Sequence, residues 1–175
     1  MSDDEDERMV EIELGRIVLR DHSLTAPQYI YLREKRGERS FPIIIGFPEA
    51  TEIQRVVTGV RTERPMTHQL LHETIQSLGA SVASVDIVDV RQNTFFARIQ
   101  LTDGAGAPLA SIDARPSDSI ALAMRARCPL RVAESVLEMV RTDDAADSLG
   151  EPEDKPPQAE EGPGDPELGG GAPGF

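Results

Sequence analysis

The sequence predicts a single α+β domain in which strands, arranged in mixed or antiparallel sheets, pack against helices. Three observations favour this class. Apolar and polar residues alternate in several short segments, apolar residues recur at helical spacing in others, and glycine or proline separates the segments. The chain has 175 residues, of which 39% are hydrophobic, so it can bury one core of ordinary size. With no Trp, 2 Tyr and 5 Phe, that core is mostly aliphatic.

The first third of the chain predicts three strands. They cover residues 10–19, 29–32 and 41–45. Gly15 interrupts the alternation of the first strand, which indicates a β-bulge. Gly37 lies in a polar turn between the second strand and the third. Because Pro42 cannot donate a backbone hydrogen bond, the third strand is expected at a sheet edge, or else Pro42 lies at its start.

Two helices are expected next. The first begins at Phe47, because Pro48 and Glu49 suit a first helical turn, and it ends before Arg64-Pro65. Thr67 is the predicted N-cap of the second helix, and Gly79 marks its end. Four apolar residues at helical spacing are expected to form the buried face of the second helix: Leu70, Leu71, Ile75 and Leu78.

The second half of the chain predicts a similar order of elements. Three strands are followed by a helix that begins at Pro116 and stops before Pro129, then by a short strand and a final helix. The strands cover residues 82–90, 95–101, 109–114 and 130–132, and the final helix covers 133–139. The repeated order, strand-strand-strand-helix-helix, suggests an internal duplication, although the two halves share no residue-level match.

The net charge of −13 is concentrated at the two ends of the chain. Residues 1–7 contain five acids and no base, and residues 142–175 contain ten acids and one base, whereas residues 8–141 contain sixteen acids and seventeen bases. We expect 1–8 and 142–175 to be disordered acidic tails and 9–141 to be the folded domain. The nearly neutral body permits contact with nucleic acid, whereas the acidic tails would repel nucleic acid or compete with it for a basic surface.

Composition also bounds the compartment and the class of chemistry. The one cysteine, Cys128, excludes an internal disulfide framework and a Cys-rich zinc site, and it is expected to be a buried structural thiol. The apolar runs are too short to span a membrane, and no apolar signal-peptide core follows the acidic N-terminus, so we expect a cytoplasmic protein. The body has sixteen arginines and one lysine, a bias that suits phosphate binding but that a GC-rich genome also explains.

The sequence contains no P-loop, serine-hydrolase, zinc-protease or dinucleotide-binding motif, but charged residues cluster at three expected helix starts. Glu49 and Glu52 would share one helix face, where paired carboxylates either hold Mg²⁺ or Mn²⁺ or only complement the helix dipole. Arg64 would bind a phosphate beside free N–H groups, and His68 would act as a general acid or base. The alternative for this second cluster is a helix cap followed by an exposed histidine.

The third cluster surrounds the helix start at Pro116. Asp113 lies at the end of a strand, and Arg115 and Asp118 lie on either side of the turn into the helix. Two acids that flank an arginine would hold a metal ion and a scissile phosphate. Equally, Arg115 would pair with Asp113 or Asp118 and only lock the turn.

Three strings of residues give the chain a specific resemblance. They are Phe-Pro-Ile-Ile-Ile-Gly at 41–46 with Glu49-Ala50, Arg-Pro-Met-Thr-His at 64–68, and Asp-Ala-Arg-Pro-Ser-Asp-Ser-Ile-Ala-Leu-Ala at 113–123. In order and spacing they resemble the bifunctional nuclease family of bacteria and plants, long catalogued as a domain of unknown function. The resemblance covers about residues 9–141. It implies an α+β domain that forms dimers or larger assemblies and cleaves both DNA and RNA. Gln69 stands where the family commonly has Asp, which removes one potential metal ligand.

Two functions are consistent with these residues. The first is a nuclease, a hydrolase of phosphodiester bonds with low sequence specificity that acts on DNA and RNA as a homodimer or a higher homo-oligomer. Its candidate catalytic residues are Glu49, Glu52, Arg64, His68, Asp113, Arg115 and Asp118. Its candidate ligands for Mg²⁺ or Mn²⁺ are Glu49, Glu52, Asp113 and Asp118, and no organic cofactor is expected. The second is a non-catalytic binding or regulatory module in which the three clusters are structural. The first requires the clusters to meet in one cleft.

Overall fold

The computed structural model describes residues 7–20 and 26–141. In these residues seven strands form one sheet in the order β3-β2-β1-β7-β4-β5-β6. The strands are β1 (Met9–Val18), β2 (Gln28–Glu34), β3 (Ser40–Ile45), β4 (Ser81–Arg91), β5 (Thr94–Thr102), β6 (Pro108–Ala114) and β7 (Leu130–Ala133). The helices are α1 (Phe47–Thr58), α2 (Thr67–Ser77), α3 (Pro116–Ala126) and α4 (Glu134–Arg141). Most of the predicted tail 1–8 and all of the predicted tail 142–175 lie outside the described residues.

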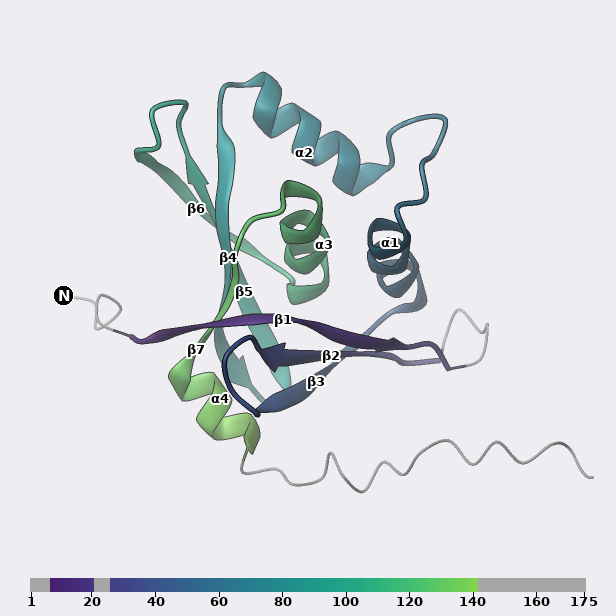
Figure 1. The fold of residues 1–175 in the computed structure, drawn as a ribbon, viewed down its shortest axis with the longest axis vertical. Coiled ribbons are helices and arrows are strands. Elements are labelled where there is room, and N and C mark those ends of the chain that lie inside the picture. Colours follow the sequence, from purple (N-terminus) through teal and green to yellow (C-terminus); the bar gives the residue numbers. More distant parts are fainter. Residues whose placement is uncertain (1–6, 21–25, 142–175) are drawn as a thin grey trace, which may run out of the picture.

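The sheet consists of two antiparallel meanders joined by one short strand. β1, β2 and β3 form the first meander, and β4, β5 and β6 form the second. β7 pairs antiparallel with β1 and parallel with β4, so it holds both meanders in a single mixed sheet. The sheet twists strongly, and in Figure 1 the first meander runs across the view while the second runs upward. The predicted α+β class is confirmed, and β7 separates the two helices of the second half.

Glycine and proline act where the sequence predicts them to. The register of β1 with β2 shifts between Leu14 and Arg16, which places the predicted bulge at Gly15. A side chain at Gly15 would approach the carbonyl oxygen of Tyr31 to 3.3 Å, so the bulge favours a small residue. Pro42 lies in β3, which is an edge strand. Asn93, with a φ of 59°, lies in the tight turn between β4 and β5.

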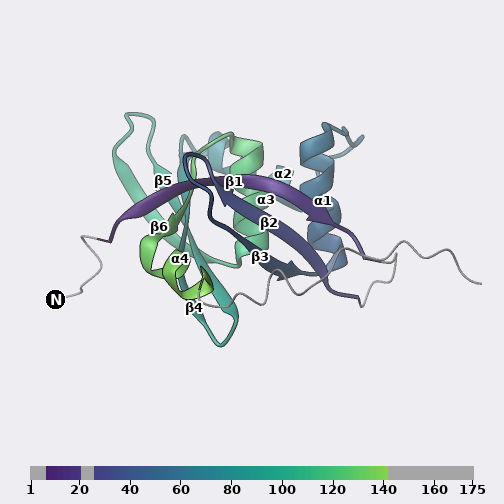
Figure 2. The same cartoon turned by 60° about the horizontal axis from the view of Figure 1, so that its bottom comes forward.

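Three helices share one face of the sheet. α1 and α2 both pack against α3, and α3 packs on β4 and β5, so α3 is the central helix of this layer. α4 contacts β3, β4 and β7, and Figures 1 and 2 place it on the opposite side of the sheet from the other helices. Ile120 and Leu122 of α3 are fully buried, as an aliphatic core requires. None of the described helices has the length and apolar composition needed to cross a bilayer.

The second helix differs from the prediction in two ways. Its N-cap is Met66, and Thr67 is its first helical residue, with no side-chain cap on the helix. Of the four residues predicted to be buried only Ile75 is, while Leu70, Leu71 and Leu78 are 57%, 43% and 79% exposed. The reason is the position of α2 at the rim of the domain, where it touches α3 and β4 along one line. Its apolar stripe is wider than the surface available to cover it.

Candidate active site

The start of α1 aims two glutamates at the neighbouring helices. Gly46 is extended, Pro48 occupies the first turn, and the backbone N–H of Ala50 donates to the carbonyl oxygen of Gly46, which begins the helix where the sequence predicts it. Ala50 and Ile53 point into the core. Because residues three or four apart share a helix face, Glu49 and Glu52 lie beside that buried stripe, toward α3.

The start of α3 supplies the second part of the site. The Nε of Arg115 donates to Oδ2 of Asp118 at 2.7 Å, and its terminal nitrogen reaches Oε1 of Glu49 at 3.1 Å. Arg115 therefore joins the first turns of α1 and α3. The first turn of α2 adds His68, whose Nε2 lies 3.1 Å from Oδ1 of Asp118.

Glu52 forms a second, more deeply buried centre. Its side chain is 7% exposed and accepts hydrogen bonds from Arg55 on its own helix and from Arg125 on α3, whose Nε lies at 3.0 Å. The Nδ1 of His68 lies 4.0 Å from the same Oε1 of Glu52 that Arg125 binds. His68 is therefore placed between two carboxylates, those of Asp118 and Glu52.

These contacts join three helices in one charged group, which we call the helix cluster. Its members are Glu49, Glu52, Arg55, His68, Arg115, Asp118 and Arg125. Five of the seven sequence-predicted site residues belong to it. Arg64 and Asp113 do not make an ion pair or hydrogen bond with any member in the described part of the chain.

The positions of the two excluded residues follow from local structure. Arg64 is exposed in the loop between α1 and α2, where its carbonyl oxygen accepts a hydrogen bond from Thr62. Asp113 precedes Ala114, which packs against the core, and successive residues of a strand point to opposite faces. Asp113 is therefore directed to the face of β6 away from α3, opposite Arg98 in the strand register.

Arg55 and Arg125 are members that sequence reasoning missed. Arg55 follows Glu52 by three residues, a spacing that places opposite charges on one helix face and that was visible in the sequence. Arg125 lies seven residues after Asp118 on α3, two turns along the same face, but its partner Glu52 is 73 positions away. The packing of α1 against α3 had to be known before this pair could be assigned.

The electrostatics of the helix cluster keep its exposed carboxylate ionised. Partial burial opposes ionisation of Asp118, but hydrogen bonds from Arg115 and His68 outweigh it and lower the pKa of Asp118 below its usual value. The same carboxylate raises the pKa of Arg115. At neutral pH Asp118 is thus an anion that can orient the ring of His68. Cys128, which was predicted to be buried, is only partly buried, and this burial raises the pKa of its thiol.

Three of the four predicted metal ligands lie in the helix cluster. Within the residues that the structure describes, no group of three or more His, Cys, Asp or Glu side chains is arranged to hold a metal ion. Asp113 lies apart, and arginines occupy the oxygens of Glu49, Glu52 and Asp118. These donors do not fit a divalent cation unless an arginine moves away.

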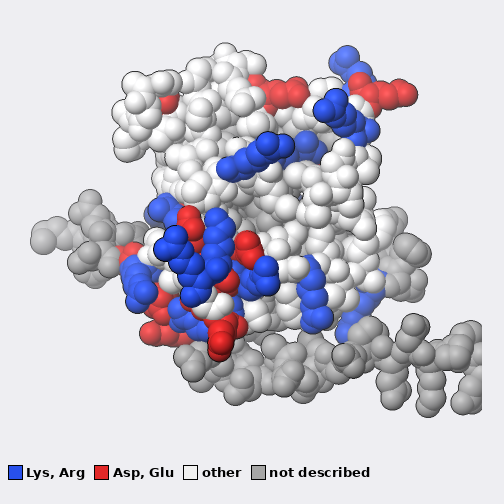
Figure 3. Space-filling view, in the orientation of Figure 1, with Lys and Arg blue, Asp and Glu red and all other residues white. Residues whose placement is uncertain are grey.

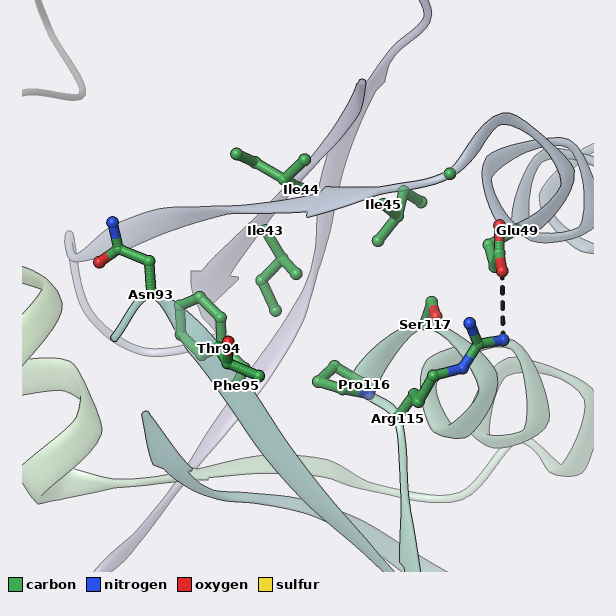
Figure 4. Close-up of a pocket in the computed structure, with 11 residues that line it drawn as sticks. Ile43, Ile44, Ile45, Glu49, Asn93, Thr94, Phe95, Arg115, Pro116 and Ser117 are labelled. Carbon is green, nitrogen blue, oxygen red and sulfur yellow. Dashed lines mark ion pairs between the residues drawn. The ribbon is translucent and has the colours of Figure 1, made fainter. Parts of the chain in front are cut away.

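A cavity of about 300 Å³ opens beside the Glu49–Arg115 pair. Figure 4 shows this pair at one side of the cavity and the end of β3 and the β4–β5 turn around the rest. Ile45 and Gly46 of the first sequence string and Pro116 and Ser117 of the third line it. The first and third strings that carry the family resemblance therefore meet at this cavity, and the second string contributes His68 to the adjacent helix cluster.

The structure defines a mixed-sheet α+β domain with an Arg–carboxylate–His cluster between three of its helices. Residues 30–144 match the bifunctional nuclease domain, so the chain belongs to the bifunctional nuclease domain family.

The chain is similar to proteins of bacteria and plants. An uncharacterized protein of Mycobacterium tuberculosis is 41% identical over 108 residues, which cover 62% of this chain and 63% of that protein. Bifunctional nuclease 2 of Oryza sativa subsp. japonica is 32% identical over 64% of this chain, and bifunctional nuclease 1 of Arabidopsis thaliana is 29% identical over 52% of it. The matched regions span only 35% and 28% of these two plant proteins.

Proposed function

We propose that the protein is a nuclease, a phosphodiesterase that cleaves DNA and RNA with low sequence specificity. The observation that carries the proposal is the placement of His68 between Asp118 and Glu52, with Arg115 and Arg125 on the same carboxylates. An acid–base group next to guanidinium groups is what hydrolysis of a phosphodiester needs. The names of the plant relatives support the same activity.

The residues of the helix cluster have separate roles in this proposal. Water attacks phosphorus, the bond from phosphorus to the leaving sugar oxygen breaks, and the water gives its proton to solvent. His68, which lies between the carboxylates of Asp118 and Glu52, is the group that donates a proton to the leaving oxygen. Arg115, which is two-thirds exposed, neutralises charge that develops on the phosphate oxygens.

The test is cleavage of labelled single-stranded DNA and RNA by highly purified protein. His68→Gln is expected to lower kcat/KM by about 100-fold or more, because general acid catalysis contributes about 10²–10⁴-fold. Arg36→Gln, in the exposed β2–β3 turn, is the control that should leave cleavage unchanged. Cleavage that persists undiminished in folded His68→Gln protein would contradict the assignment and indicate a contaminating nuclease.

The same assay tests the sequence-based prediction of a metal. Loss of cleavage in EDTA and its recovery with Mg²⁺ or Mn²⁺ would support metal assistance, and full cleavage in EDTA would contradict it.

We also propose that the protein acts in the cytoplasm, where its single thiol Cys128 stays reduced, and that it forms a homodimer or a larger homo-oligomer.

The second candidate function is a non-catalytic binding or regulatory module. The observation that favours it is that each carboxylate of the helix cluster already has a cationic partner, which is also what a purely structural cluster shows. Purified protein that cleaves neither DNA nor RNA with or without divalent ions, yet binds a defined partner in calorimetry, would favour this candidate.

A further inference from the structure

A second and larger cavity, which we call the basic groove, lies on the other side of the helix cluster. Its volume is about 530 Å³, and the C-terminal ends of α1 and α3 and one side of α2 form its walls. Four arginines line it: Arg55, Arg61, Arg125 and Arg127. Glu73 is the one acidic residue among its lining residues. In Figure 3 several basic side chains lie on the upper part of this face, with acidic side chains beside some of them.

Two of these arginines are free to bind an anion. Among the described residues, neither Arg61 nor Arg127 has an ion-pair or hydrogen-bond partner for its side chain, and both are exposed. Arg55 and Arg125 share the single carboxylate of Glu52, so this pair also carries an excess of one positive charge. The groove therefore has more cationic charge than its own acids can neutralise.

The backbone at the helix ends fixes where these charges lie. α3 ends at Arg127, which has a φ of 55°, and α1 ends at Gly59, which has a φ of 68°. Left-handed residues such as these stop a helix and turn the chain away. Because the ends of both helices line the same cavity, the cations near those ends face one groove.

The groove is directly connected to His68. Arg125 lines the groove and binds Oε1 of Glu52, the oxygen that lies 4.0 Å from Nδ1 of His68. Gln69, the residue after His68, also lines the groove. A chain of phosphates held by the groove would therefore pass next to the acid–base group of the helix cluster.

We propose that the basic groove binds the phosphate backbone of a nucleic acid strand and leads it to the helix cluster. This inference rests on the proposed function for its substrate class. Arginine forks match phosphate oxygens, whereas none of the lining residues is Phe, Tyr or Trp, and the imidazole of His72 is the one ring among them. Contacts to phosphate carry no sequence information, which accounts for a single site that accepts DNA and RNA without sequence preference.

The test measures binding separately from cleavage. The probe is a fluorescein-labelled 20-nucleotide single-stranded DNA, and its anisotropy is titrated with the full chain carrying His68→Gln, over a range of NaCl concentrations. The groove variant adds Arg61→Gln and Arg127→Asn, since asparagine tolerates the left-handed backbone of position 127. The matched control adds Lys35→Gln and Arg36→Gln, which remove the same charge from the exposed β2–β3 turn.

The groove variant is expected to bind the probe about 10- to 30-fold more weakly at 0.1 M NaCl, with a salt slope shallower by about 1.4, because each lost phosphate contact removes about 0.7 from the slope. The control is expected to bind within about twofold of its parent. Equal losses in both variants, an unchanged affinity in the groove variant, or no binding by the parent would overturn the inference. Binding that behaves as expected while the protein with native His68 cleaves nothing would overturn the proposed activity and leave the groove assignment standing.

Discussion

At the scale of single residues, Glu52 is the structural centre of the helix cluster. It is buried, and two arginines from different helices donate to it. A buried carboxylate with such partners stabilises the fold chiefly because its removal leaves the partner cations uncompensated. Its neighbour Asp118, in contrast, is about one-third exposed and reaches solvent. The two acids that contact His68 therefore have different roles, one structural and one facing solvent.

This difference predicts a large cost for Glu52→Gln. The substitution removes the charge that holds Arg55 and Arg125, so the free energy of unfolding should fall by about 3 kcal/mol. Urea unfolding followed by circular dichroism measures it. Glu73→Gln, on the exposed side of α2, is the control and should change stability by less than about 0.5 kcal/mol. Equal stability of the two variants would show that Glu52 does not hold α1 and α3 together.

At the scale of the elements, α2 is the helix whose apolar stripe the domain leaves uncovered. Leu70 is exposed on it, Leu78 just after it is also exposed, and Met66 just before it is 44% exposed. Clusters of exposed apolar residues are typical of protein interaction surfaces. Since we propose a homodimer or a larger homo-oligomer, α2 is the element we expect at the contact between copies.

The contact predicts the behaviour of an α2 variant. Leu70→Gln together with Leu78→Gln should convert an oligomer to a monomer, because the apolar area that drives association is lost, and should leave the free energy of unfolding of the monomer nearly unchanged. Light scattering coupled to size-exclusion chromatography gives the mass. Leu109→Gln, at an equally exposed position on β6, is the control. If the Leu109→Gln control dissociates and the α2 variant does not, the contact between copies lies at the β6 edge of the sheet and not at α2.

At the scale of the whole molecule, Arg39 connects the first meander to the last helix. It donates to Glu34 in β2 at 2.6 Å and to Glu134 at the start of α4 at 2.5 Å, although Glu134 lies 95 positions away along the chain. Hydrogen bonds from Arg39 lower the pKa of both carboxyl groups. Because the pKa values are lower in the folded state, the resulting stability is complete above the usual carboxyl pKa of about 4.3 and is lost as pH falls through the lowered values.

The stability of an Arg39 variant should therefore depend on pH in a defined direction. Arg39→Gln is expected to lower the urea midpoint most at pH 7 and progressively less as pH falls toward 2, because protonation of the two carboxyl groups removes the charge that Arg39 pairs with. Unfolding curves at a series of pH values measure the difference from the unmodified protein. Arg33→Gln, whose exposed partner is Glu13, is the control that should show little difference at any pH. A deficit for Arg39→Gln that is equal at pH 2 and pH 7 would contradict this account.

Local patterns account for the parts of the fold that the sequence predicted. The bulge at Gly15, the edge strand with Pro42 and the helix start at Phe47 each depend on the conformational limits of one or two residues, which do not need tertiary information. The prediction of which residues of α2 are buried was wrong, because burial does depend on tertiary information. The periodicity of α2 is helical, but burial depends on what covers the stripe, and α2 lies at the rim of the domain.

The candidate site divides in the same way. Glu49, Glu52, His68, Arg115 and Asp118 were predicted because each lies at a helix start where charged side chains gather. Asp113 lies two residues from Arg115 in the chain, yet it is directed to the other face of the sheet, because residues alternate along β6 and Ala114 packs on the core side. Arg125 is distant in the chain and yet belongs to the helix cluster because α1 packs on α3.

By itself the sequence determined the kinds of element, their order and the family, because strand alternation, helical spacing, turn residues and the motif strings are all properties of neighbouring residues. Only the tertiary structure decided that β7 joins the two meanders in one sheet, that His68 lies between two carboxylates, and that four arginines share a groove. The physical reason is that these pairings depend on strand register and helix packing, which bring together residues tens of positions apart that no local pattern links.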